Sequence, residues 1–88
     1  MGYEYKVERP SVFTEEGVKN LLHVRDQAFA AIKTAGVVTM QKAVTGLTGS
    51  SWEHLALVDF LVEIGDLHEV RQAQASAGQY RLFTRPCR

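Results

Sequence analysis

Three histidines, one cysteine and a few acidic pairs are the side chains of this chain that could perform chemistry. His23, His54 and His68 stand far apart and lack the paired spacing of zinc ligands, and one cysteine does not complete a zinc motif. The lone Cys87 also cannot form an intramolecular disulfide, which is typical of proteins from a reducing cytoplasm. We therefore expect no metal site.

Acid/base and phosphate-binding motifs are equally weak. Helix capping and solvated helix faces explain the pairs Glu15–Glu16 and Glu63–Asp66 better than an acid/base site does. The segment 46–49, Gly-Leu-Thr-Gly, resembles a phosphate-binding loop but lacks the Lys-Ser/Thr that would follow. No nucleophile elbow is present. The sequence predicts a protein that is not an enzyme and that needs no cofactor or small-molecule substrate.

The chain has 88 residues, 45% hydrophobic and 23% charged, a balance typical of a folded globular protein. We expect one domain over residues 1–88, because a chain of this length builds a single core. No apolar run opens the chain and no stretch approaches roughly 18 apolar residues, so we expect a cytoplasmic protein without membrane contact. Ten basic residues balance ten acidic ones, whereas dedicated nucleic-acid binders usually carry a basic surface.

The first expected element covers residues 3–8, whose apolar and charged side chains alternate as in a half-buried strand. Residues 1–10 are thus an N-terminal strand or arm that Pro10 ends. Thr14 then caps a helix over residues 15–34, which Gly36 closes. Apolar side chains recur along this helix at helical spacing, and we expect them to face the core: Val18, Leu21, Leu22, Phe29 and Ile32.

After a short extended link at residues 37–39, a second helix fits residues 40–47. Ser50 or Ser51 caps a third helix that runs to about Ile64, with Glu53 in its acidic first turn. Strands are expected over residues 67–71 and 79–83, joined by a small polar loop at residues 72–78. Residues 71–77 also favour helix, so an extended helix is the alternative there.

The resulting order is helix, extended link, helix, turn, helix and hairpin. Residues 38–51 and 57–67 follow the pattern threonine, short helix, glycine-serine turn, long helix and glycine. This pattern resembles the winged helix-turn-helix superfamily, in particular repressors of the multiple-antibiotic-resistance type. Residues 80–83, Tyr-Arg-Leu-Phe, are similar to a second wing strand. The resemblance implies an α+β winged helix: three helices and a C-terminal β-hairpin wing.

In DNA-binding members of this superfamily, the third helix enters the major groove and the wing contacts phosphates or the minor groove. The resemblance therefore implies a set of candidate DNA contacts on the second helix, the turn and the wing: Lys42, Ser50, Ser51, Arg71, Gln72, Gln74, Ser76 and Arg81. The alternative is that these basic residues are scattered solubilising charges.

The third helix does not suit base reading. At about 100° per residue, its core arc holds Leu55, Leu57, Val58, Leu61, Val62 and Ile64. The opposite arc holds Trp52, Glu53, Ala56, Asp59, Phe60 and Glu63. This outer arc is acidic, and carboxylates are repelled by phosphates. Its apolar stripe, Trp52, Ala56 and Phe60, predicts a contact with a partner or within a homodimer, unless Trp52 and Phe60 pack as core against the N-terminal strand or the first helix.

Two functions follow as hypotheses. The first is a small DNA-binding or regulatory protein, active in transcription regulation, of the size found among phage and prophage accessory proteins. It would act as a dimer and bind duplex DNA mainly through the wing and the second helix. The second is a protein-interaction winged helix that uses the acidic and aromatic face of the third helix.

Overall fold

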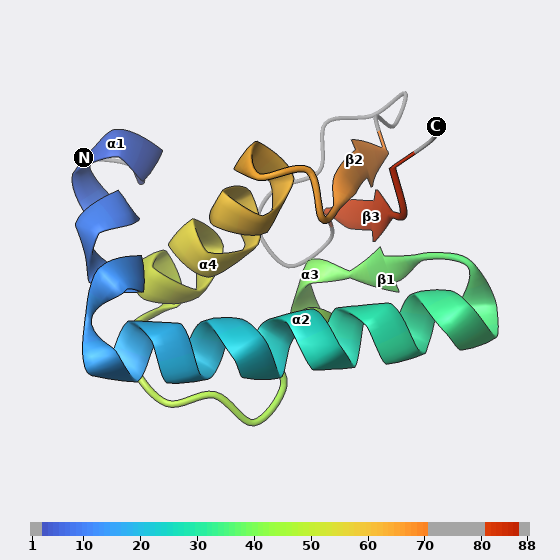
Figure 1. Cartoon of the computed structure of the whole chain (residues 1–88), viewed down its shortest axis with the longest axis horizontal. Helices are drawn as coiled ribbons and strands as arrows, with labels where there is room; N and C mark the ends of the chain where they lie inside the picture. Colours follow the sequence, from blue (N-terminus) through green and yellow to red (C-terminus); the bar gives the residue numbers. More distant parts are fainter. Residues whose placement is uncertain (1–2, 71–80, 87–88) are drawn as a thin grey trace.

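The computed structural model describes residues 3–70 and 81–86. Its elements, in chain order, are α1 (Tyr5–Glu8), the 3-10 helix η1 (Arg9–Phe13), α2 (Glu15–Ala35), β1 (Val38–Thr39), α3 (Met40–Ala43), α4 (Ser51–Glu63), β2 (His68–Val70) and β3 (Leu82–Thr84). The fold is α+β, mostly helical with one three-stranded antiparallel sheet (Figure 1). None of the described helices has both the length and the apolar content needed to cross a membrane.

The N-terminal segment is helical, so the strand predicted over residues 3–8 is wrong. The sheet lies at the other end of the molecule from α1, and the strands paired in it are β1, β3 and β2 (Figure 1). Pro10 occupies the first turn of η1, where its fixed φ favours a helical start. The alternation of Tyr3 and Tyr5 with charged residues reflects contacts of their hydroxyl groups with α4.

The long helix α2 confirms the predicted caps. The Thr14 side chain accepts a hydrogen bond from the Gly17 N–H at 2.9 Å, and Gly36 closes the helix with a φ of 86°. Its predicted inward face is partly wrong: Ile32 is buried and Leu21 packs half-buried against the core, but Val18, Leu22 and Phe29 are exposed. The helix packs closely against its neighbours, so its buried residues are small or medium in size. They are Gly17, Val24, Ala28 and Ile32.

The second helix, α3, is shorter than predicted. It ends at Ala43, and a turn with Gly46 at a φ of 86° follows. The Gln27 side chain of α2 donates hydrogen bonds to the carbonyl groups of Ala43 and Thr45, at 3.0 and 2.8 Å. These carbonyl groups are satisfied from outside the helix, which explains why it stops early.

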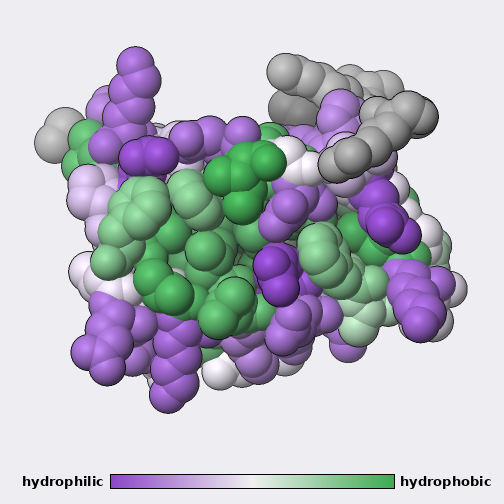
Figure 2. Space-filling view, viewed as in Figure 1, coloured by the Kyte–Doolittle hydropathy of each residue, from purple (hydrophilic) through white to green (hydrophobic). Residues whose placement is uncertain are grey.

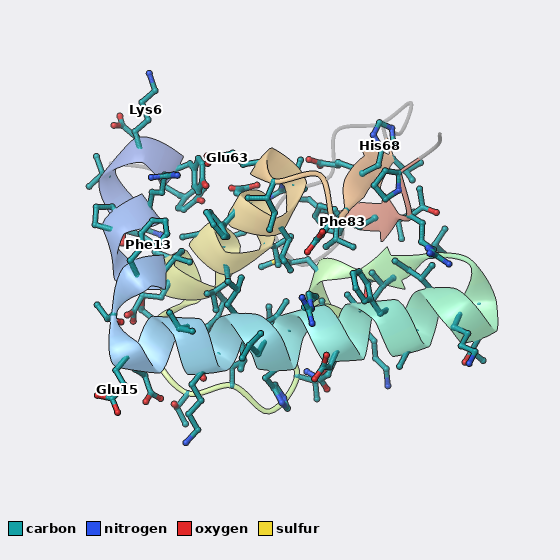
Figure 3. All side chains as sticks on the ribbon, in the orientation of Figure 1. Lys6, Phe13, Glu15, Glu63, His68 and Phe83 are labelled. Atoms are coloured by element: carbon teal, nitrogen blue, oxygen red, sulfur yellow. The ribbon has the colours of Figure 1, made fainter. Side chains whose placement is uncertain are left out.

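The sheet has the order β1-β3-β2. The predicted hairpin strands are present but shorter, at His68–Val70 and Leu82–Thr84, and the loop predicted at residues 72–78 lies outside the described residues. The predicted extended link contributes a strand of its own, because Val38 pairs with Phe83. Phe83 therefore lies in the central strand, fully buried between the sheet and the helices (Figure 3).

The helix α4 begins with a capping box. Ser50 Oγ accepts from the Glu53 N–H at 3.2 Å, and the Glu53 carboxylate accepts from the Ser50 N–H at 3.0 Å. This reciprocal pair confirms the predicted start of the helix. Leu57, Val58 and Leu61 are buried as predicted, whereas Ile64 at the C-cap is 50% exposed.

Candidate interaction surfaces

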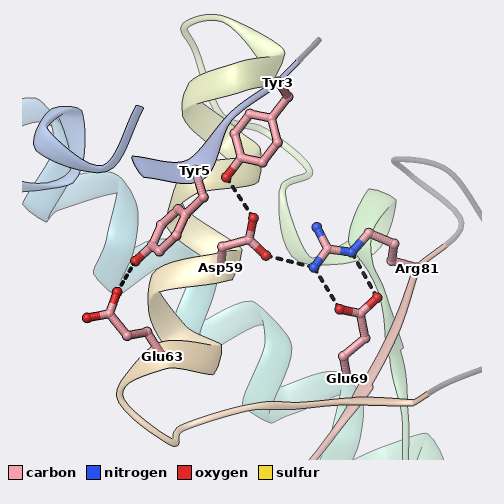
Figure 4. A network of polar contacts seen from close by, with 6 residues as sticks. All are labelled: Tyr3, Tyr5, Asp59, Glu63, Glu69 and Arg81. Atoms are coloured by element: carbon pink, nitrogen blue, oxygen red, sulfur yellow. Dashed lines mark hydrogen bonds and ion pairs between the residues drawn. The ribbon is translucent and has the colours of Figure 1, made fainter. Parts of the chain in front are cut away.

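The outer face of α4 is closed by a network of polar side chains (Figure 4). Tyr3 Oη donates to Asp59 Oδ2 at 2.6 Å, and Arg81 Nη2 donates to Asp59 Oδ1 at 2.7 Å. The same guanidinium donates to both carboxylate oxygens of Glu69, at 2.8 and 3.0 Å. The network joins the N-terminal segment, α4, β2 and the residue before β3.

One turn further along α4, Glu63 holds the N-terminal segment. Its carboxylate accepts hydrogen bonds from Arg9, at 2.9 and 3.0 Å, and from the Tyr5 hydroxyl. The Arg9 guanidinium also lies over the rings of Phe13 and Phe60, at 5.0 and 5.6 Å. These two rings meet edge to face, with centroids 5.3 Å apart. The Glu63 side of α4 is therefore covered by the protein's own first residues.

The environment of the two tyrosines changes their acidity. Burial and then the hydrogen bond to Asp59 raise the pKa of Tyr3 well above its usual value. Burial and then the hydrogen bond to Glu63 raise the pKa of Tyr5 to about 12. Burial of Arg81 opposes its charged form, but the hydrogen bonds to Glu69 and Asp59 outweigh this and raise its pKa.

We expect the tyrosine contacts to weaken at alkaline pH. The folded pKa of each tyrosine lies above the unfolded value of about 10, so their stabilisation is complete below that pH. Above it the stabilisation declines, and the contribution of Tyr5 is lost as the pH rises through about 12. Near pH 8, the variant Tyr3→Phe/Tyr5→Phe should unfold with a free energy about 1–2 kcal/mol below that of the wild type.

Above about pH 10 this difference should shrink, because only the wild type loses up to about 1.4 kcal/mol per pH unit for each tyrosine. Denaturant unfolding of both proteins over a pH series measures the difference. A difference that stays constant across the series would contradict the assigned tyrosine environments.

The predicted protein interface on α4 is mostly internal. Ala56 is fully buried, so its placement on an exposed stripe is wrong. Asp59, Phe60 and Glu63 contact the N-terminal segment or Arg81 instead of solvent alone. For Phe60 the alternative of packing within the protein is confirmed, although against η1 and not against a strand. Trp52 and Glu53 remain exposed at the start of the helix.

The predicted DNA contacts that the structure describes lie on α3, at the start of α4 and directly before β3. Lys42 is exposed on α3, whereas Ser50 and Ser51 begin α4 at the far end of the loop 44–50. Ser50 is occupied as the helix cap. Arg81 has a 16% exposed side chain held by two carboxylates, which leaves its guanidinium poorly placed for phosphate. The remaining candidates, Arg71, Gln72, Gln74 and Ser76, lie outside the described residues.

An apolar surface that the sequence did not predict lies on α2, η1 and the end of α4. Figure 2 shows hydrophobic side chains gathered over η1, α4 and the adjoining flank of α2. The exposed large hydrophobic residues on η1, on α2 and at the C-terminal end of α4 are Phe13, Val18, Leu22, Phe29 and Ile64; we call this set the apolar face. Phe13 is 54% and Leu22 49% exposed. Large exposed apolar groups that lie together often mark an interface.

A sequence signal for the apolar face does exist. The apolar side chains of α2 span a wide arc, while small residues at positions 17 and 28 lie at one edge of that arc. Small residues allow the closest approach of a helix to its neighbours, so the core contact falls on their side. The larger side chains are then left on the outer flank.

Two of the three histidines contact the loop between α3 and α4. His54 Nε2 lies 3.0 Å from the Thr48 carbonyl oxygen, and His23 Nε2 lies 3.3 Å from that of Thr45. Within residues 3–70 and 81–86, no three His, Cys, Asp or Glu side chains are grouped so that they could hold a metal ion.

No family model, curated protein or solved structure matches this chain.

Proposed function

We propose that this chain is a winged-helix domain that binds another protein chain through the apolar face. The order α2-β1-α3-α4-β2-β3 and the sheet order β1-β3-β2 support the winged-helix assignment. This agrees with the resemblance of residues 38–51, 57–67 and 80–83 to that superfamily. A winged helix serves DNA binding and protein binding equally well, so the choice depends on its surfaces.

The observation that carries the choice is the contrast between α4 and the apolar face. The helix that would enter the major groove has Asp59 and Glu63 on its outer side, and both are engaged with the N-terminal segment. The apolar face is open, with Phe13, Leu22 and Ile64 each about half exposed. Burial of apolar area contributes about 25 cal/mol per Å², so covering this face stabilises a complex.

Duplex DNA is the second candidate, favoured by the exposure of Lys42 on α3 and of Ser51 at the start of α4. In the described structure, Arg81 is paired with Asp59 and Glu69 and is therefore not available to strengthen DNA binding. DNA binding through Lys42 and the wing would be salt-sensitive, because cations released from the phosphates drive it.

Site-specific photo-crosslinking distinguishes protein binding by the apolar face from DNA binding. A benzophenone amino acid is placed at Leu22, on the apolar face, and separately at Lys42, in the cells that produce the protein. We expect protein adducts from position 22 and fewer from position 42. Nucleic-acid adducts from position 42 with no protein adducts from position 22 would overturn the proposal and favour DNA binding.

A further inference from the structure

Four side chains of α2 lie on one outward stripe of the helix. Val18, Leu22, Arg25 and Phe29 are separated by four, three and four residues, the spacing that keeps side chains on one helix face. The three apolar members are exposed, and Arg25 is half-buried. The Arg25 guanidinium lies 5.8 Å from the centre of the Phe29 ring, and its buried Nε has no hydrogen-bond partner in the described structure.

The spacing of this stripe reads the same in both directions along the helix. When a second α2 lies antiparallel to the first, Val18 comes opposite Phe29 of the second copy. In the same register, Leu22 comes opposite Arg25 of the second copy. Each contact then occurs twice, as a two-fold interface requires. The aliphatic part of Arg25 covers Leu22 of the second copy while its charged end remains at the edge.

The charges beside the stripe fit the same register. On one flank are Leu21 and Ala28, which face the protein's own core. On the other flank are Lys19 and Asp26, both exposed and without an ion pair in the described residues. In the antiparallel register, Lys19 lies beside Asp26 of the second copy, and Asp26 lies beside Lys19 of the second copy. A two-fold parallel pair would instead place this charged flank against the Leu21 and Ala28 flank of the second copy.

We propose that the partner of the apolar face is a second copy of this chain, joined by antiparallel packing of the two α2 helices. This inference depends on the proposed protein-binding function and names the partner of the same surface. Phe13 and Ile64, on η1 and at the end of α4, extend the apolar area beside the helix pair.

Charge exchange on the open flank tests the register. The wild type, Lys19→Glu, Asp26→Lys and Lys19→Glu/Asp26→Lys are compared by sedimentation equilibrium. Each single variant turns two attractive pairs into two repulsive ones, so its dimer Kd should rise about tenfold or more. The double variant restores both pairs, and its Kd should return to within about threefold of the wild type. Lys42→Glu makes the same charge change on α3 and should leave the Kd unchanged.

A wild type that stays monomeric up to about 1 mM would overturn the proposal, since such an affinity is negligible. A dimer that is indifferent to both single variants, or that the double variant does not restore, would also overturn it, because the interface then lies elsewhere. The photo-crosslinks at Leu22 distinguish the two levels of failure. Adducts with a different protein retain the protein-binding function and reject the second copy, whereas the lack of any protein adduct rejects the function itself.

Discussion

Gly17→Ala is expected to lower the free energy of unfolding by about 3 kcal/mol or more. In an exposed helix position the same change stabilises by about 1 kcal/mol, because alanine favours helix. At Gly17 an added Cβ would lie 2.1 Å from the Ser11 carbonyl oxygen and 2.7 Å from that of Val12. Both atoms belong to the backbone of η1, so the clash forces the two helices apart.

The matched control is Ala30→Gly, at an exposed position of the same helix. It should lower the free energy of unfolding by about 1 kcal/mol, the ordinary cost of glycine within a helix. Denaturant unfolding followed by circular dichroism measures both variants. A Gly17→Ala protein as stable as the wild type would show that α2 does not lie directly on η1.

Arg81→Met is expected to lower the free energy of unfolding by about 2–3 kcal/mol. Methionine keeps much of the side-chain volume next to Phe83, over whose ring the guanidinium lies at 5.1 Å. The substitution leaves Asp59, whose side chain is 18% exposed, without its cationic partner. A carboxylate that loses its partner in a mostly buried position is the main cost. Loss of the Glu69 ion pair costs less, because the Glu69 side chain is 40% exposed and water can solvate its carboxylate.

The control for this prediction is Arg85→Met, which makes the same change at an exposed arginine without an ion pair in the described residues. Its effect should stay within about 0.5 kcal/mol. Amide hydrogen exchange should also quicken in the N-terminal segment of Arg81→Met, because Tyr3 binds the same Asp59 carboxylate. Equal stability of the two variants would mean that the network does not stabilise the fold.

The helices α2 and α4 were predictable because their ends carry local signals. Thr14 and Ser50 bond to the backbone three residues later, and Gly36 takes the left-handed conformation that closes a helix. These interactions involve neighbours in the chain, so residue type and spacing are sufficient to predict them. The two C-terminal strands were also predictable from local residue patterns, although their ends were not.

The candidate surfaces were predicted less well. The N-terminal alternation of Tyr3 and Tyr5 fits a strand, but both side chains form hydrogen bonds with α4. Their partners, Asp59 and Glu63, are 56 and 58 residues further along the chain. No local pattern contains such a contact. Ala56 was assigned to the outer arc by helical angle alone, yet it is fully buried, because the breadth of a buried face depends on every element packed against it.

Residue types alone were sufficient to predict where the long helices begin and end, the presence of the hairpin strands, and the acidic character of the third helix. Each of these depends on residue type and local spacing. Which apolar side chains reach solvent depends instead on how the elements pack together. The close contact at Gly17 and Ala28 places the core on one side of α2, so Val18, Leu22 and Phe29 face outward. The tertiary structure likewise decided that Arg81 binds two carboxylates of its own chain, because Asp59 and Glu69 meet it only after the sheet packs on α4.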